Sequence, residues 1–376
     1  MTRLRELAGL FLRLGATAFG GPAAHIAMME DEVVRRRQWL THAEFLDLLG
    51  ITHLIPGPNS TEMAIHIGQQ RAGFRGLVIA GAAFILPAAA ITGTLGWAYV
   101  RFGSQPRARG LLYGIKPVMI AIVLQALISL APKAAKTRAL VAIGSLSGLA
   151  SAFGANELLC LAIAGLTALT VQRRRAPPPL MLGVGSSGVL GAVAAAKVVA
   201  TPFSLGALFL VFTKIGSVLF GSGYVLLAFL RTDFVEHRHW LTEAQLLDAV
   251  AVGQVTPGPV FTTATFIGYL LGGAPGALLA TLGIFLPAFL FVAISGVLLP
   301  KIRRSPALGA FLDGVNVASL ALMAVVTLQL GRAALVDLTA VVLAAASAVL
   351  LVRFKLNSTW LIAGGALVGV LSQGFG

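Results

Sequence analysis

The strongest constraint on this chain is an internal repeat that places one proline-glycine-proline triplet inside each of two apolar segments. FLRLGATAFGG at 11–21 matches FTKIGSVLFGS at 212–222, and WLTHAEFLDLLGITHLIPGPNST at 39–61 matches WLTEAQLLDAVAVGQVTPGPVFT at 240–262. Both matches keep the same offset of 201 residues. Chance similarity between two apolar stretches would not hold Trp, Asp and Pro-Gly-Pro in one register. A period this long indicates a pair of helical bundles rather than a solenoid.

The composition places these bundles in a membrane. Of the 376 residues, 57% are hydrophobic and only 11% are charged, whereas soluble domains are close to a quarter charged. This excludes an ordinary water-soluble enzyme and a disordered chain. The net charge of +14 comes from basic residues between apolar runs, where they act as topology signals and do not indicate a nucleic-acid partner. The single Cys160 permits no intramolecular disulfide. We expect an all-α integral membrane protein in contact with lipid, without a cofactor or a metal site.

Apolar runs of about twenty residues mark the expected membrane spans. Residues 4–20 predict a retained membrane helix, because Arg residues interrupt the run and no small-residue cleavage site follows it. Further spans are expected at 75–100, 110–131, 139–154, 157–171, 204–230, 276–299, 308–331, 335–352 and 359–373. The basic, proline-rich stretch at 172–179 indicates a linker, and whether 180–202 adds a span stays open. The expected division is a first repeat over 1–171, a linker region over 172–203 and a second repeat over 204–376.

The basic loops indicate how the two halves are oriented. In the first half Lys and Arg gather at 71–75, 133–138 and 173–175, while in the second half they gather at 353–355. The exception is the loop at 101–109, which is basic in both halves, with 301–304 as its match. Because basic loops stay on the cytoplasmic side, this alternation favours antiparallel halves. An inverted repeat of this kind is typical of secondary transporters. A parallel repeat is the alternative.

The two triplets predict two broken helices. Proline removes a backbone donor and clashes with the preceding turn, and in lipid such a break is tolerated only inside protein or beside a water cavity. The helix that restarts after each break points free N–H groups and a positive dipole end at it, which favours an anion. The predicted substrate-binding residues here are Pro56, Gly57, Pro58, Asn59, Ser60, Thr61, Pro257, Gly258, Pro259 and Thr262. The alternative is a pair of kinks that only shape the bundle.

Two further sets of residues are assigned to the same site. Glycine runs allow a second unwound turn or tight helix packing, which adds Gly20, Gly21, Gly221, Ser222 and Gly223. Basic residues inside apolar segments are costly and usually functional, which adds Arg13, Lys214 and Lys116. Arg13 and Lys214 have the alternative of snorkelling to the interface.

The few acidic and histidine residues supply candidates for proton coupling. They are His53, Glu62, Asp47 and Asp248. The repeat replaces His53 by Gln254 and Glu62 by Thr263, so neither group is needed in both halves. Glu32 and Asp233 are interpreted as ion-pair partners of Arg37 and Arg238, and His25 and His66 as polar packing residues.

These motifs resemble those of the chromate ion transporter family. The resemblance rests on FxRxGxxxFGGP with ExxxxRxWLTxxEFxDxLxxxxxxPGPNS, and on FxKxGxxxFGSG with DxxxxRxWLTxxQxxDAxAxxQxTPGP, over about 4–171 and 204–373. It is similar to the two-domain form of that family. The resemblance implies an inner-membrane carrier of a prokaryote that exports chromate, with sulfate as an analogue, driven by the membrane potential or the proton gradient. Ser222 and His53 depart from the residues usual in the family.

Three other functions stay open at this point. The first is a carrier of a different anion, and the second is an ion channel. The third is a membrane-embedded enzyme on a lipid-linked phosphate, for which Glu62 and His53 are the only acid and base near a break. A homodimer is also open.

Overall fold

The computed structural model describes residues 2–19, 21–175, 202–220, 225–302 and 305–374, which form helices joined by turns and contain no strand. The predicted all-α class is confirmed. The first half contains α1 (Thr2–Thr17), α2 (Gly21–Glu30), the π-helical η1 (Asp31–Arg36), α3 (His42–Thr52), α4 (Asn59–Phe102), α5 (Pro106–Ala134), α6 (Arg138–Ala152) and α7 (Glu157–Arg175). The second half contains α8 (Leu205–Val218), α9 (Leu226–Leu230), η3 (Arg231–His237), α10 (Glu243–Val255), η4 (Val260–Thr262), α11 (Thr263–Ile302), α12 (Pro306–Ala334), α13 (Leu338–Phe354) and α14 (Ser358–Gly374).

The elements of the two halves correspond in order, and they differ from two of the sequence expectations. The span expected over 204–230 is wrong, because α8 ends at Val218 and Leu219 has an extended backbone before α9 begins. Helix α7 continues to Arg175, so the first residues assigned to the linker are helical. Residues 176–201, with the undecided span at 180–202, lie outside the described residues.

A sharp bend divides α4 and α11 at matching places. The backbone leaves helical geometry at Ala72 and Gly73 in α4, and at Gly272 and Gly273 in α11. Gly73 and Gly273 have φ angles of 60° and 62°, a conformation that glycine adopts without the clash of a Cβ atom. Each helix therefore has a short limb after the Pro-Gly-Pro triplet and a long limb after the bend.

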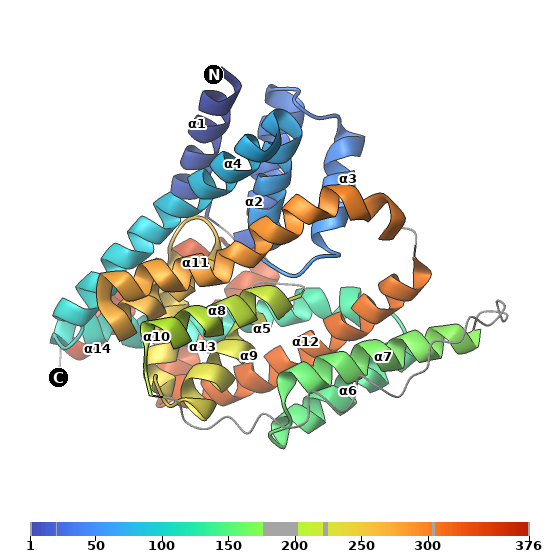
Figure 1. Cartoon of the computed structure of the whole chain (residues 1–376). Helices are drawn as coiled ribbons and strands as arrows, with labels where there is room; N and C mark the ends of the chain where they lie inside the picture. Colours follow the sequence, from blue (N-terminus) through green and yellow to red (C-terminus); the bar gives the residue numbers. More distant parts are fainter. Residues whose placement is uncertain (1, 20, 176–201, 221–224, 303–304, 375–376) are drawn as a thin grey trace.

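The two repeats interlock. Helix α5 packs against α13 and α14 of the other half, and α12 packs against α6 and α7. Small residues permit this close approach: a Cβ atom on Gly114 of α5 would collide with the backbone of Gly365 in α14, and one on Gly314 of α12 with Ala164 in α7. The long limbs of α4 and α11 cross between α1–α3 and the remaining helices (Figure 1). The scaffold around this crossing is thus shared by both halves.

The hydrophobic cores of the two halves differ. Helices α8–α10 share one continuous core with α5 and α12, which includes Phe212, Leu246, Met119 and Leu322. The corresponding helices of the first half form a separate core around Phe11, Phe45 and Phe84. Helix α10 packs against α5 and α12, whereas α3 packs chiefly against α4. Similar sequences therefore adopt two packings against one scaffold.

Four segments of the described chain are long and apolar enough to cross a membrane: α4, α5, α12 and residues 260–295. Large apolar side chains point outward along them, including Leu86, Leu286, Leu290 and Leu328. Exposed apolar surface on this scale is typical of a protein surrounded by lipid. The structure is that of a multi-pass membrane protein.

Candidate functional site

Each Pro-Gly-Pro triplet is bound by the backbone of the opposite half. Helix α3 ends at Thr52 and α4 begins at Asn59, so the first triplet lies between two helices. The Gly57 N–H donates to the carbonyl of Leu219 at 2.8 Å, and the Gly258 N–H donates to the carbonyl of Ala18 at 2.9 Å. Ala18 and Leu219 are themselves related by the repeat offset. The two hydrogen bonds are therefore equivalent: each half donates one from its triplet glycine to the matching carbonyl of the other half.

The glycines of the triplets allow this crossing. Gly57 and Gly258 have φ angles of 141° and 82°, which side-chain-bearing residues rarely adopt. A Cβ atom on Gly258 would meet the Ala88 Cβ atom and the Gly15 carbonyl, and one on Gly57 would meet Glu62 and the Ala288 Cβ atom. Each triplet thus lies against the long limb of the opposite half.

The residues after the first triplet are polar and enclosed. Ser60, Thr61 and Glu62 are buried in the first turn of α4. The Asn59 Nδ2 atom lies 3.1 Å from Nδ1 of His53, which ends α3 across the break. The Thr61 hydroxyl and both Glu62 carboxyl oxygens have no hydrogen-bond partner among the described residues. The first break therefore offers unsatisfied polar groups beside the helix N-terminus.

The second break is more apolar. Val260 and Phe261 are buried where the first half has Asn59 and Ser60. Thr262 donates to the Pro259 carbonyl at 2.8 Å and accepts from the hydroxyl of Thr92 at 3.2 Å. The hydroxyl predicted to face the substrate is thus already bonded inside the protein.

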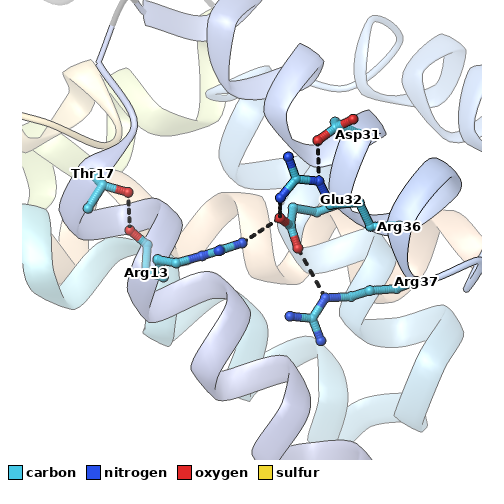
Figure 2. Close-up of polar contacts among 6 residues, drawn as sticks. All are labelled: Arg13, Thr17, Asp31, Glu32, Arg36 and Arg37. Carbon is cyan, nitrogen blue, oxygen red and sulfur yellow. Dashed lines mark hydrogen bonds and ion pairs between the residues drawn. The ribbon is translucent and has the colours of Figure 1, made fainter.

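Arg13 belongs to a cluster of charges centred on Glu32. Figure 2 shows Arg13, Arg36 and Arg37 converging on the Glu32 carboxylate, with Arg36 also reaching Asp31. The Arg13 Nη2 atom lies 2.6 Å from Glu32 Oε1, and about half of the Arg13 side chain (51%) is exposed. Three guanidinium groups face two carboxylates, so one positive charge is left over. The cluster lines an open cavity of about 400 Å³ beside Thr17 and Met28.

The second half repeats this cluster. Lys214 Nζ lies 2.6 Å from Asp233 Oδ2, and Arg238 lies 3.0 Å from Asp233 Oδ1. The predicted pairs of Glu32 with Arg37 and of Asp233 with Arg238 are present. The sequence did not indicate that Arg13 and Lys214 join them, because these residues precede the acids by 19 positions. In both halves a cation on the first helix is thereby tied to the segment that follows it.

Lys116 and Asp248 are brought together from different halves. Lys116 Nζ on α5 lies 2.9 Å from Asp248 Oδ1 on α10, and the Tyr99 hydroxyl donates to Asp248 Oδ2 at 2.8 Å. The Asp248 side chain is only 7% exposed. The repeat relates this pair to Asp47, exposed on α3 of the first half, and to Asn316 on α12 of the second half. Sequence reasoning named Lys116 and Asp248 separately and missed Tyr99.

Of the remaining predicted residues, some are described by the structure and others are not. Gly21 begins α2 with a φ angle of 74°, and His53 lies exposed at the end of α3. Gly20, Gly221, Ser222 and Gly223 lie outside the described residues. Sequence reasoning assigned His66 to packing, yet its Nε2 atom is buried without a partner in the described structure. Its spacing of four residues from Glu62 was the signal that could have singled it out.

Comparison with known proteins identifies the family. The family described as Chromate transporter matches residues 5–192 and 206–370. The Chromate transport protein of Cupriavidus metallidurans is 34% identical over 98% of this chain and 93% of its own length. The Probable chromate transport protein of Synechococcus elongatus is 34% identical over 89% of this chain and 86% of its own, and the Chromate transport protein of Pseudomonas aeruginosa is 33% identical over 87% and 81%. No solved structure matches the chain. With both repeats matched and these relatives aligned over most of their length, the chain belongs to the chromate transporter family.

Proposed function

We propose that this protein is a secondary carrier that exports chromate, with sulfate as an analogue, through the inner membrane of a prokaryote. The observation that carries the proposal is the pair of reciprocal hydrogen bonds from Gly57 to Leu219 and from Gly258 to Ala18. They bring both broken helices to the boundary between the halves. A tetrahedral dianion there would meet the N–H groups of restarted helices and the polar residues Asn59, Ser60 and Thr61. Arg13, Lys214 and Lys116 are proposed to attract the anion electrostatically.

The two packings of the repeats support alternating access. Helices α8–α10 share the core of α5 and α12, while α1–α3 do not. If the halves are inverted, an exchange of these two packings would open the boundary first to one side of the membrane and then to the other. Such an exchange needs no ATP-driven engine, because the membrane potential or the proton gradient supplies the work.

Transport into everted vesicles tests the proposal. We expect labelled chromate and sulfate to accumulate in everted vesicles that contain the protein, faster with an inside-positive membrane potential than without. Gly57→Ala is expected to abolish accumulation, since the new Cβ atom disturbs the crossing. Gly9→Ala is the matched control, because a Cβ atom on Gly9 meets nothing within 4 Å. Equal uptake by Gly57→Ala and Gly9→Ala, at equal amounts of protein, would contradict a site at the breaks.

A carrier of a different anion is the second candidate. The unsatisfied Thr61 hydroxyl and the net positive charge around Glu32 suit tetrahedral oxyanions in general rather than chromate alone. Competition of unlabelled phosphate, sulfate and molybdate against labelled chromate separates the two candidates. The family is one of transporters, which leaves the lipid-phosphate enzyme without support.

A further inference from the structure

Glu62 differs from the other buried acids of the described chain that have charged neighbours. Its side chain is 0% exposed and its Oε1 atom lies against Gly57 in the first triplet. Neither of its oxygens has a hydrogen-bond partner among the described residues. Glu32, Asp233 and Asp248 are also buried, but each faces Arg or Lys. Glu62 is thus a buried acid beside the break that has neither a cation nor a hydrogen-bond partner among the described residues.

His66 lies one turn further along α4. Residues four apart share a helix face, and the His66 Nε2 atom is buried and unpartnered in the described structure. At the corresponding turn the second half has Thr262 and Thr263, and Phe266 matches His66. Helix α11 contains no Asp, Glu or His, and no cation before Lys301. The acid and base therefore occur once per carrier, although the breaks occur twice.

The titratable groups on neighbouring elements are engaged elsewhere. His53 of α3 contacts Asn59, and His25 of α2 contacts the Ala18 carbonyl. Arg13 of α1 pairs with Glu32, and Lys214 of α8 pairs with Asp233. Asp47 of α3 is exposed. Glu62 and His66 are two buried ionisable groups on one face of α4 after the first break. The Glu62 oxygens and the His66 Nε2 atom have no hydrogen-bond partner among the described residues.

We propose that Glu62 is the protonation site of the carrier, that His66 exchanges the proton with Glu62, and that this proton binds together with the oxyanion. An isolated carboxylate costs several kcal/mol or more to bury without a partner, so Glu62 is a neutral carboxylic acid in this conformation, in which its side chain is buried. When water reaches the break, the acid gives one proton to the His66 imidazole or to water and becomes a carboxylate. That carboxylate would repel a dianion held at the same helix N-terminus.

Proton binding and oxyanion binding therefore reinforce each other. Linkage is reciprocal, so each ligand raises the affinity for the other by the same factor. The anion carries one proton through this site, and the pair crosses with one negative charge fewer than the bare dianion. Of the two energy sources proposed for export, this coupling selects the inside-negative membrane potential, because an outward-moving proton runs against the inward proton gradient. This inference rests on the proposed function, because the coupling needs an anionic substrate at the break.

Binding of labelled sulfate to the purified carrier over a range of pH tests the coupling. We expect the dissociation constant of the wild type to rise with pH by up to tenfold per unit, the limit for one linked proton. Glu62→Gln mimics the neutral acid, so its affinity should stay high and independent of pH. Glu62→Asp keeps a titrating carboxyl and should restore the dependence. A pH-dependent Glu62→Gln, or one that binds much more weakly than the wild type, would overturn the proposal.

Infrared spectroscopy gives a measurement that needs no substrate. The carbonyl stretch of a protonated carboxyl should be present in the wild type at neutral pH and absent in Glu62→Gln. Glu44→Gln is the matched control, because Glu44 is an exposed capping residue and the repeat has Gln245 in its place. If this band is unaffected by Glu62→Gln, the proposal fails even if oxyanion transport is found. If the band is lost but the wild type binds no oxyanion, Glu62 is protonated and the coupling to an oxyanion is overturned together with the proposed function.

Discussion

Lys116 on α5 and Asp248 on α10 form an ion pair across the two halves of the chain, with 2.9 Å between Nζ and Oδ1. The Lys116 side chain is 20% exposed and that of Asp248 is 7% exposed. The pair fastens a helix of the second repeat to the shared scaffold. The repeat-related positions, Asp47 of the first repeat and Asn316 of the second, cannot form the same ion pair, because Asn316 replaces the lysine.

Removal of Lys116 is expected to destabilise the protein strongly. Lys116→Met leaves the Asp248 carboxylate buried without its cation, which typically costs about 3–5 kcal/mol. The double variant Lys116→Met with Asp248→Leu should recover much of the lost free energy of unfolding, because no buried charge is then left without a partner. Thermal unfolding in detergent gives the comparison. A double variant as unstable as the sum of the two single variants would contradict an energetic coupling between these residues.

Neutralising Arg13 should impair transport more than stability. Arg13→Gln removes one of three cations around Glu32, and half of the Arg13 side chain is exposed, so the loss of folding free energy is expected to stay near the ~0–1 kcal/mol of surface ion pairs. The half-saturation concentration for chromate should rise, since a positive charge is lost from the cavity. Uptake kinetics at equal protein amounts measure this. If Arg13→Gln transports chromate at the wild-type rate, Arg13 has only a structural role, which is to hold α1 against the segment that contains Glu32.

Asn59 should matter more for the substrate than Val260, although the two occupy matching positions. A hydrogen bond to a charged ligand contributes roughly 1.5–3 kcal/mol, which is about tenfold or more in affinity. Asn59→Ala is therefore expected to raise the half-saturation concentration by at least about tenfold, and Val260→Ala by much less. Equal effects, or a larger effect at Val260, would place the polar face of the site in the other half.

Acid should weaken the contact between Asp337 and Tyr113. The Ala340 N–H and the Tyr113 hydroxyl hold the pKa of the Asp337 carboxyl below its usual range. Because this pKa is lower in the folded state than in the unfolded state, the stabilisation is present above the unfolded pKa and is lost as the pH falls through the folded pKa. Unfolding temperatures of the wild type and Asp337→Asn should therefore differ at neutral pH and converge in acid. A difference that does not depend on pH would contradict this.

Reporter fusions should reveal the orientation of the repeats. If the halves are inverted and have equal numbers of spans, fusions after Arg175 and after Gly376 are expected to report opposite sides of the membrane. Activity and fluorescence reporters at each site, with opposite requirements for the cytoplasm, give an internal control. The same side for both fusions would favour a parallel repeat.

The local signals of the sequence were sufficient for the class of fold. The repeat, the apolar runs and the Pro-Gly-Pro triplets each depend on neighbouring residues, so they predict helices and their interruptions without tertiary information. The contacts of the triplets, by contrast, depend on tertiary structure. Nothing near Gly57 indicates that its N–H will meet Leu219, because the two residues come from opposite halves and join through backbone atoms.

The ion pairs also show that local sequence does not predict contacts between distant segments. The pairing of Glu32 with Arg37 follows from one stretch of chain, whereas the approach of Arg13 depends on how α1 packs. Lys116 and Asp248 were each recognised as unusual charges in apolar surroundings. Their pairing was hidden because the repeat offset relates Lys116 to Asn316 rather than to Asp248. The burial of the His66 Nε2 atom without a partner in the described structure is likewise visible only in three dimensions.

The exchange of hairpins between the repeats has a consequence for how such a carrier could arise. Helices α6 and α7 cover α12, and α13 and α14 cover α5. In a polypeptide of half this length, the fifth helix would lack the helices that pack against it until a second copy supplied them. Folding and dimerisation would then be one event, and its rate would fall on dilution. Joining two such copies end to end replaces that encounter by an intramolecular one with a fixed effective concentration. Gene fusion would then free each half to diverge, as Glu62 and Thr263 have done.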